Sequence, residues 1–418
     1  MKITSIEEYL DEYIKIWPFS GNVGVIRHGN IIFKHSYGMA CHEYRIQNTI
    51  DTCFTLGSIS KQFTAFVVML LNEQGKIDIY KPINDYLPKE LMIDNRITAH
   101  NLMSHTSGLH QFYNWEEDFF QIYDRGTFNR LDFFQKYINR PLGFEPGAKF
   151  EYNNANYNML AWAIENICNK SFEHVLHEMI FLPLEMNNTV LDDGHNIVKN
   201  RAFPYQIDRN DIVRCQYYNE KFSIGAGAVM SNFHDLCKWY RCLKDRKLLS
   251  NETYDKFFTE NLAGYCYGIN RDNIYGRTRF SHGGDHLGVM TYVQYFFEDD
   301  ICVIILSNLE CGNNYHIGNA ITEIFFNGST EKPKRFEKIQ LGKEELSKYE
   351  GIYLENKIEI QQVGEGVEFM RFNGEVHHLL YPVSDNKFAK VWVDQDKPYT
   401  ITEDEDGSYE FFGYKKSK

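Results

Sequence analysis

Two pairs of strand-like segments lie far apart in the sequence and constrain the fold more than any other feature. Residues 21–26 and 31–37 flank an Arg-His-Gly-Asn turn, and Asn and Gly favour the positive φ angles that close a hairpin. A second pair of strand-like segments occurs at residues 289–297 and 301–307, and a Glu-Asp-Asp turn connects them. We therefore expect one antiparallel sheet built from both ends of a domain, with a mostly helical segment inserted between them.

A change in composition near residue 331 predicts a second domain. The stretch 331–335 is charged, contains proline and is typical of a linker. Short strand-like segments separated by Gly and Asp turns follow it and predict a small all-β barrel; they are residues 349–353, 357–363, 367–372, 376–381, 388–393 and 409–414. The predicted fold class is α+β, an antiparallel sheet flanked by helices with an inserted helical subdomain, plus a C-terminal β-barrel. The predicted domains are 1–334, with the helical insertion at roughly 76–215, and 335–418.

The composition excludes several classes of partner. Hydrophobic residues make up 43% of the chain and charged residues 24%, which is ordinary for a globular protein. Lys and Arg number 44 against 57 Asp and Glu, for a formal net charge of −13, so nucleic acid or an anionic membrane would be repelled on average. The longest apolar runs, 65–71 and 301–306, are far shorter than the roughly 20 residues that cross a bilayer. We expect no nucleic-acid partner and no membrane span.

The N-terminal segment and the cysteines predict a cytoplasmic location. The first 20 residues include the acidic Glu7, Glu8, Asp11 and Glu12, whereas a secretory signal has a basic start and then an apolar core. The nine cysteines are odd in number and include no Cys-x-x-Cys pattern. This usage fits reduced, mostly buried thiols better than a disulfide framework or a zinc knuckle. The oligomeric state cannot be inferred from these features.

One of three Ser-x-x-Lys patterns has the context of a nucleophile. The patterns beginning at Ser329 and Ser384 lie in the linker and in a polar turn between two predicted barrel strands. Ser58 and Lys61 instead open an apolar helical run that Gly75 would end. Residues three apart share one face of a helix, so a desolvated Lys61 amine would lie beside the Ser58 hydroxyl and could act as its base. On this motif alone, Ser58 as a simple helix cap remains an open alternative.

A second motif, Tyr152-Asn153-Asn154, follows a Pro-Gly turn and precedes a helical run. Functional groups concentrate on such tight loops. A phenol near a lysine can relay a proton, and an Asn amide can hold a substrate carbonyl. A buried tyrosine with a satisfied hydroxyl is the alternative interpretation of Tyr152.

A third motif, Ser281-His-Gly-Gly-Asp285, lies just before the predicted strand at residue 289. The glycines Gly283 and Gly284 would let the backbone approach a bound ligand closely. A histidine at a strand edge, His282, would face the same cleft.

Two pairs of histidines suggest a metal site, but neither has suitable spacing. A strand would not bring His282, Asp285 and His286 together as a chelate. His174 and His177 are followed by Glu, an order that matches neither helical zinc motif. We therefore expect no metal and no cofactor.

Taken together and in this order, the three motifs resemble those of the penicillin-recognising serine hydrolases. The resemblance is strongest to the branch of class C β-lactamases and D-alanyl-D-alanine carboxypeptidases, which also includes esterases and D-aminopeptidases. It spans roughly residues 15–325 and includes the further segments Phe19–Val25, Phe54–Ala65, Ile97–Leu109, Pro183–Met186 and Gly225–Ser231. The C-terminal barrel resembles the lipocalin-like modules appended to some members.

The resemblance implies a metal-free acyl-enzyme mechanism. Ser58 would be the acylated nucleophile, and Lys61 and Tyr152 would share the work of the general base. The backbone N–H groups of Ser58 and Asp285 would form the oxyanion hole.

The resemblance also implies a substrate-binding set of Asn154, His282, Gly283 and Gly284. Asn154 would hydrogen-bond the amide of the substrate. Lactamases have Lys-Thr-Gly at the third motif, and replacing that cation by His282, which is neutral for much of the time at pH 7, disfavours tight capture of a β-lactam carboxylate. The expected substrate is a small peptide, amide or ester, with D-amino-acid peptides or carboxylic esters favoured over β-lactams.

Two other classes of protein remain as alternatives. One is a non-catalytic, penicillin-binding-like protein that senses peptides or binds a partner, although the intact set Ser58, Lys61 and Tyr152 argues against it. The other is an α/β-hydrolase, which is disfavoured because the chain has no Gly-x-Ser-x-Gly motif.

Overall fold

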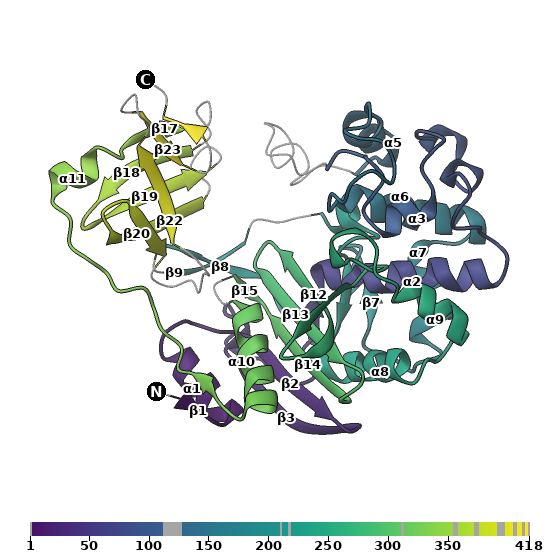
Figure 1. The fold of residues 1–418 in the computed structure, drawn as a ribbon, viewed down its shortest axis with the longest axis horizontal. Coiled ribbons are helices and arrows are strands. Elements are labelled where there is room, and N and C mark those ends of the chain that lie inside the picture. Colours follow the sequence, from purple (N-terminus) through teal and green to yellow (C-terminus); the bar gives the residue numbers. More distant parts are fainter. Residues whose placement is uncertain are drawn as a thin grey trace. The chain divides into compact units, whose positions relative to one another are not determined.

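The computed structural model divides into two compact units, each with its own hydrophobic core (Figure 1). The first unit comprises residues 1–19, 204–215 and 309–418, and the second comprises residues 20–203 and 216–308. The predicted domain boundary between residues 334 and 335 stays a prediction. The structure describes residues 2–111, 128–209, 211–215, 219–310, 313–353, 358–371, 376–390, 398–403, 408–411 and 414–416.

A six-stranded antiparallel sheet forms the frame of the second unit, in the order β11-β12-β13-β14-β2-β3. The two predicted hairpins are confirmed as β2 (Gly21–Arg27) with β3 (Asn30–Tyr37), and β13 (Val289–Phe296) with β14 (Ile301–Ser307). Strand β14 is buried along its whole length and pairs with β2 over seven residues. Both ends of the unit therefore build one sheet, as the sequence predicts.

Two strands of this sheet were not predicted, β11 (Asn270–Ile274) and most of β12 (Arg277–His286). Both contain several Asn, Asp and Arg residues, which are not enriched in strands. The third sequence motif lies inside β12, where Ser281 to Asp285 pair with Gln294 to Met290 of β13. The motif is therefore part of a sheet strand and does not precede the sheet.

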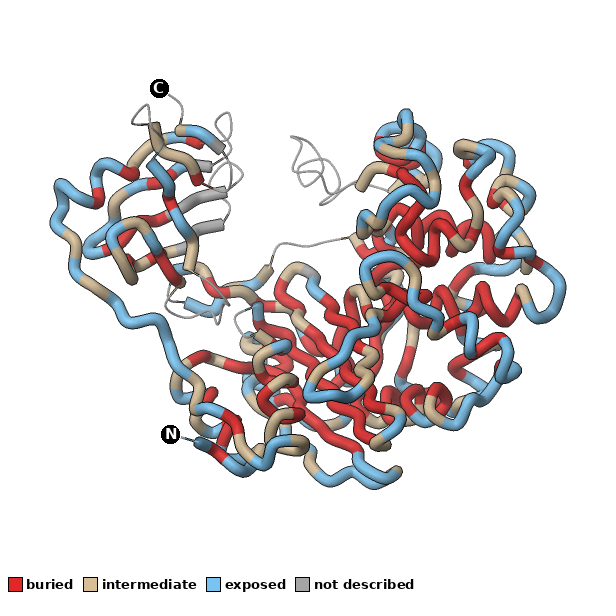
Figure 2. Tube along the Cα trace, in the orientation of Figure 1, coloured by how far each residue is buried: buried red, intermediate tan, exposed pale blue. Residues whose placement is uncertain are grey.

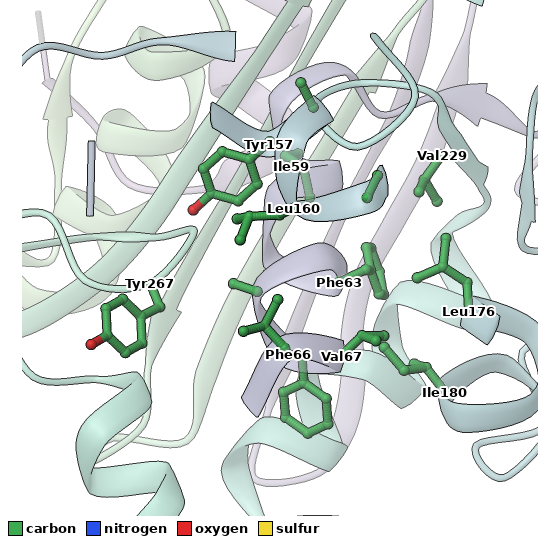
Figure 3. Packing of buried hydrophobic residues seen from close by; sticks show 14 of the residues in the cluster. Ile59, Phe63, Phe66, Val67, Tyr157, Leu160, Leu176, Ile180, Val229 and Tyr267 are labelled. Atoms are coloured by element: carbon green, nitrogen blue, oxygen red, sulfur yellow. The ribbon is translucent and has the colours of Figure 1, made fainter. Parts of the chain in front are cut away.

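Helix α2 (Ser60–Glu73) is the most buried helix among those that the structure describes. Every residue from Ser60 to Leu71 is buried, including polar ones. The helix directly continues the 3-10 turn Gly57–Ile59, and Gly75 follows it with φ +69°, a left-handed conformation that glycine adopts without a Cβ penalty. Figure 3 shows its apolar side chains packed in the core; the labelled ones are Ile59, Phe63, Phe66 and Val67, near Leu160, Leu176 and Ile180.

A buried glutamine joins α2 to the sheet and to helix α8 (Phe233–Lys244). The Gln62 side-chain oxygen accepts hydrogen bonds from Trp239 Nε1 at 3.0 Å and from Tyr295 Oη at 3.4 Å. Helix α8 lies directly on β2, because a Cβ at Gly24 would fall 2.0 Å from the Phe233 ring. The sheet and these two helices thus form one rigid support for the start of α2.

The remaining elements of the second unit are short, and Figure 2 shows that buried residues concentrate in its central strands and helices. The helices are α3 (Ala99–Met103), α5 (Arg130–Phe133), α6 (Asn154–Cys168), α7 (Phe172–Leu176) and α9 (Asn251–Phe257). Single turns occur at Ile83–Asp85, Lys89–Leu91, Phe134–Ile138, His177–Phe181, Glu220–Ser223 and Leu262–Gly264. The small sheets are β4 (Met39–Cys41) with β5 (Ile46–Gln47), and β6 (Phe54–Thr55), β10 (Val229–Ser231) and β7 (Val190–Leu191) in that order.

The first unit gathers elements from distant parts of the chain. Helix α1 (Ile6–Ile14) contacts α10 (Asn314–Asn327), and β1 (Lys2–Ile3) pairs with β16 (Thr330–Glu331). The hairpin of β8 (Tyr205–Asp208) and β9 (Asp211–Arg214) pairs in parallel with β15 (Leu309–Glu310).

An ion pair between the half-exposed Arg209 and the buried Glu368 binds the hairpin to the barrel. Arg209 lies between the two strands of the hairpin, and its guanidinium donates from Nε and Nη2 to the two carboxylate oxygens of Glu368, with the Nη2 contact at 3.1 Å. Glu368 is only 3% exposed. A buried carboxylate depends on such a partner, so the hairpin is a structural part of the barrel.

The C-terminal residues form the small β-barrel that the sequence predicts, with eight described strands in sequential order. They are β17 (Gly351–Tyr353), β18 (Ile358–Val363), β19 (Gly366–Arg371), β20 (Val376–Ser384), β21 (Lys387–Lys390), β22 (Tyr399–Glu403), β23 (Tyr409–Phe411) and β24 (Tyr414–Lys415). A bridge between Tyr353 and Lys416 brings the last strand back to the first. Strand β22 and helix α11 (Lys343–Ser347) were not predicted. Large apolar side chains fill the core, among them Tyr349, Tyr353, Leu380 and Phe388.

No helix in the described ranges is both long and apolar enough to span a bilayer. Across those ranges, no cluster of three or more His, Cys, Asp or Glu side chains is arranged to bind a metal ion.

Candidate active site

The predicted nucleophile Ser58 lies in a tight turn pressed against strand β12. Gly57, directly before it, has φ +54°, and a Cβ there would fall 2.9 Å from the carbonyl carbon of Gly284 and 3.2 Å from the Asp285 nitrogen. A side chain at Gly57 would therefore force the turn and the strand apart. The structure thus places the backbone of Ser58 beside that of Asp285, the two predicted oxyanion-hole positions.

Lys61 is fully buried and bonded to the nucleophile. Its Nζ lies 2.8 Å from Ser58 Oγ, 2.7 Å from Asn154 Oδ1 and 2.8 Å from the carbonyl oxygen of Ala226. All three are neutral oxygens, so none of these partners compensates a buried positive charge. Burial accordingly holds the Lys61 pKa well below its usual value of 10.5.

In its neutral form, which the lowered pKa favours, the amine has the right number of hydrogens for this arrangement. It carries two N–H groups, which suffice for the acceptors on Asn154 and Ala226. Its lone pair is then available to the Ser58 hydroxyl proton at 2.8 Å. In its neutral form Lys61 could therefore accept the Ser58 proton, which is the predicted role of general base.

Tyr152 lies over the lysine, on the loop that enters helix α6. The Lys61 Nζ is 4.9 Å from the centroid of the Tyr152 ring. The next residue, Asn153, caps α6 through its side-chain oxygen, which accepts from the Ala155 N–H at 2.8 Å. The cap fixes the backbone next to Tyr152, whose ring lies beside the lysine that is bonded to Ser58.

Asn154 is the first residue of α6 and faces the same lysine. Its carboxamide oxygen accepts from Lys61, and its backbone N–H donates to Gln111 Oε1 at 3.2 Å. With the oxygen used in this way, the amide NH₂ is the group that a substrate carbonyl would meet.

His282 is buried and paired through both ring nitrogens. Its Nδ1 lies 2.6 Å from the Gly283 carbonyl oxygen, and its Nε2 lies 3.0 Å from Tyr265 Oη. Since a carbonyl oxygen can only accept, Nδ1 carries the proton and Nε2 accepts from Tyr265. Burial lowers the pKa of His282 to about 3. A neutral His282 therefore stands where the Lys-Thr-Gly proteins have a cation, and its direct contact with substrate stays a prediction.

Gly284 and Thr291 hold strand β12 against the nucleophile segment. A Cβ on Gly284 would fall 1.9 Å from the carbonyl oxygen of Leu56 and 2.3 Å from Thr291 Oγ1. The Thr291 hydroxyl donates to that same Leu56 oxygen at 2.7 Å. Only a glycine at position 284 permits this approach, whereas Gly283 lies in the strand beside it.

Sequence reasoning missed three groups that the structure adds to the site. They are the carbonyl of Ala226, the hydroxyl of Tyr265 and the imidazole of His105, whose ring centroid lies 4.3 Å from that of Tyr152. No sequence pattern identifies a backbone carbonyl or an isolated tyrosine. The His-Thr-Ser-Gly-Leu segment beginning at His105 was a recognisable signal.

Comparison with known proteins places this site in a family. Residues 19–323 match the family model described as Beta-lactamase. The chain is 26% identical over 325 residues to "Putative penicillin-binding protein PbpX" of Bacillus subtilis (strain 168), covering 78% of this chain and 79% of that protein. It is also 26% identical over 328 residues to "Teichoic acid D-alanine hydrolase" of Staphylococcus aureus, covering 75% and 77%.

A solved structure extends the similarity to the whole fold. The octameric penicillin-binding protein homologue from Pyrococcus abyssi has a TM-score of 0.68 at 22% identity, covering 98% of each chain. At that identity the likeness shows the fold. Because the family match spans most of the chain and contains Ser58, Lys61, Tyr152 and the His-Gly-Gly strand, the chain belongs to the Beta-lactamase family.

Proposed function

We propose that this protein is a serine hydrolase that forms an acyl-enzyme at Ser58 on a small peptide, amide or ester. One observation carries the proposal: a fully buried lysine amine, with no carboxylate among the hydrogen-bond partners that the described residues supply, lies 2.8 Å from the serine oxygen. A buried ammonium in such surroundings is costly, so an amine kept there for stability alone is hard to explain. A base that activates a nucleophile explains it directly.

The proposed reaction has two halves. Ser58 Oγ attacks the carbonyl carbon of the substrate, a C–O bond forms, and the serine proton passes to the neutral Lys61 amine. The backbone N–H groups of Ser58 and Asp285 stabilise the oxyanion. The C–N or C–O bond to the leaving group then breaks, and the leaving group takes the proton through Lys61 or Tyr152.

Deacylation reverses these roles. Water attacks the acyl carbon and gives its proton to the base, and the ester bond to Ser58 breaks. The serine regains its proton, and the product leaves as a carboxylic acid. No cofactor enters either half of the reaction.

The substrate favoured is a D-amino-acid amide, peptide or ester. The neutral His282 offers no cation for the carboxylate of a β-lactam. One curated relative is named as a hydrolase of teichoic acid D-alanine, which supports a D-alanyl acyl group. We therefore expect turnover of D-alanyl p-nitroanilide or p-nitrophenyl acetate to exceed that of a chromogenic β-lactam.

Intact-mass measurement after incubation with a fluorophosphonate tests the proposal. We expect one adduct on the wild type and none on Ser58→Ala. Ser329→Ala is the matched control, because it removes the serine of another Ser-x-x-Lys pattern and should keep the adduct. An unlabelled wild type that also turns over none of the three substrates would refute the proposal and favour a non-catalytic peptide-binding protein.

A further inference from the structure

His105 lies directly behind Tyr152 and has no role in the reaction proposed above. It follows helix α3, is fully buried and has φ +58°, a left-handed conformation that is uncommon outside glycine. Its ring is surrounded by aromatic rings, with the Tyr152 centroid at 4.3 Å and the Tyr265 centroid at 4.8 Å. The His105 ring is thus in direct contact with the Tyr152 ring.

His105 also holds the backbone on both sides of Tyr152. The carbonyl oxygen of His105 accepts from the Glu151 N–H at 2.9 Å, and its Nδ1 accepts from the Asn153 N–H at 3.1 Å. The residues before and after Tyr152 are therefore bonded to one residue, which also contacts the ring between them. These contacts restrict both the position of the Tyr152 backbone and the plane of its ring.

A second donor fixes the orientation of the imidazole. Asn156 Nδ2 lies 3.2 Å from His105 Nδ1, and Asn156 Oδ1 accepts from Ser107 Oγ at 2.6 Å. Since both donors meet Nδ1, the proton of the neutral ring is on Nε2. Burial holds the His105 pKa well below 6.5, so the ring keeps its acceptor.

The other ring nitrogen carries a cost. His105 Nε2 is buried and has no hydrogen-bond partner among the described residues. An unsatisfied buried donor destabilises the fold, and an apolar residue would avoid this cost. A histidine at position 105 is explained, despite this cost, if Nδ1 is needed to accept the hydrogen bond from the Asn153 N–H.

We propose that His105 is a positioning residue that fixes the Tyr152 phenol over Lys61, through its bond to the Asn153 N–H and its contact with the Tyr152 ring. This inference rests on the proposed function, in which Tyr152 shares the proton transfers with Lys61. It places the effect of His105 on the acylation rate and its pH dependence, and not on substrate affinity.

Two variants separate the two contacts. His105→Asn keeps an acceptor near the position of Nδ1 and tolerates the positive φ, but it loses the ring. His105→Phe keeps the ring and loses the acceptor. His100→Asn is the matched control, because His100 lies on helix α3 and its Nδ1 is bonded to Tyr267 Oη at 2.7 Å, away from Tyr152.

The experiment measures the rate of labelling by a fluorophosphonate and the turnover of p-nitrophenyl acetate across pH, on samples whose folded fraction is known from thermal denaturation. We expect His105→Phe to lower kcat about 10- to 100-fold with KM changed less than about threefold, because a misplaced catalytic group costs rate of this order. We expect a smaller loss for His105→Asn, a shifted pH profile for both, and neither effect for His100→Asn.

The outcomes distinguish this inference from the proposed function. If the wild type is neither labelled nor active, the proposed function fails and the inference with it. If the wild type reacts but folded His105→Asn keeps the wild-type rate and pH profile, only the positioning role is overturned. A loss that appears in KM alone would also overturn it. Should His105→Phe fail to fold, His105→Asn carries the test by itself.

Discussion

Replacing Lys61 by methionine tests whether the Lys61 amine is neutral in the folded protein, and the test does not depend on an activity measurement. The amine is fully buried among neutral acceptors, and burial lowers its pKa well below 10.5. Between the folded-state pKa and 10.5, the unfolded chain therefore binds one proton more at Lys61 than the folded chain does. The free energy of unfolding of the wild type must then rise with pH, by about 1.4 kcal/mol per pH unit.

Lys61→Met removes this proton and keeps a side chain of similar length. The variant also loses three hydrogen bonds, each worth about 1 kcal/mol, but their loss does not depend on pH. The pH dependence is therefore more informative than the absolute change. We expect the stability of the wild type relative to Lys61→Met to increase by up to about 2.7 kcal/mol between about pH 7 and about pH 9.

Urea denaturation at several pH values, followed by tryptophan fluorescence, measures this difference. Other groups titrate equally in both proteins and cancel. Lys76→Met is the control, since Lys76 is an exposed lysine just beyond the same helix, and its difference from the wild type should stay constant. A constant difference for Lys61→Met as well would mean that the folded protein keeps an ammonium there, and would refute our assignment of a neutral base.

Three further substitutions have defined outcomes. Gly284→Ala places a Cβ 1.9 Å from the Leu56 carbonyl oxygen; we expect a loss of about 1–3 kcal/mol of stability and of fluorophosphonate labelling, and wild-type labelling would contradict the close approach. Burial raises the pKa of Glu220 well above 4.5, so the wild type loses stability as the pH rises from 4.5 towards the folded-state pKa. We therefore expect the melting temperature of Glu220→Gln to increase relative to that of the wild type from about pH 5 upward. A pH-independent difference in melting temperature would argue against a protonated carboxyl. Arg209→Met leaves the buried Glu368 carboxylate without its guanidinium and should cost about 1–3 kcal/mol, which Arg209→Met/Glu368→Gln should largely restore in a thermal melt, whereas equal losses would exclude a charge effect.

The sequence predicted those parts of the structure that depend on local pattern. The apolar runs at residues 289–297 and 301–307 gave the correct strands, and the turn residues gave the correct hairpins. Strands β11 and β12 were missed because they are stabilised by pairing with neighbouring strands, and their composition does not favour strands. Pairing with β12, which itself pairs with β13, supplies what Asn270 to Ile274 lack in propensity.

The site shows the same division. Ser58 and Lys61 are three residues apart on one helical start, so their contact was predictable from periodicity. The proximity of Tyr152 to Ser58 and Lys61 could be predicted only from the resemblance to a family, because the local sequence around Tyr152 does not indicate its contacts. The Ala226 carbonyl and the Tyr265 hydroxyl enter through loops, whose paths no pattern of apolar and polar residues encodes.

The pairing of β14 with β2 has a consequence for biosynthesis. Strand β2 leaves the ribosome early, but its partner from Ile301 to Ser307 emerges only after the whole helical region. Until then the apolar face of β2 and one of its edges stay open on the nascent chain, and contacts between such distant segments form slowly. A chain stalled before residue 301 would expose an unpaired strand edge of the kind that promotes aggregation, so the native fold of this unit can close only after β14 has been synthesised.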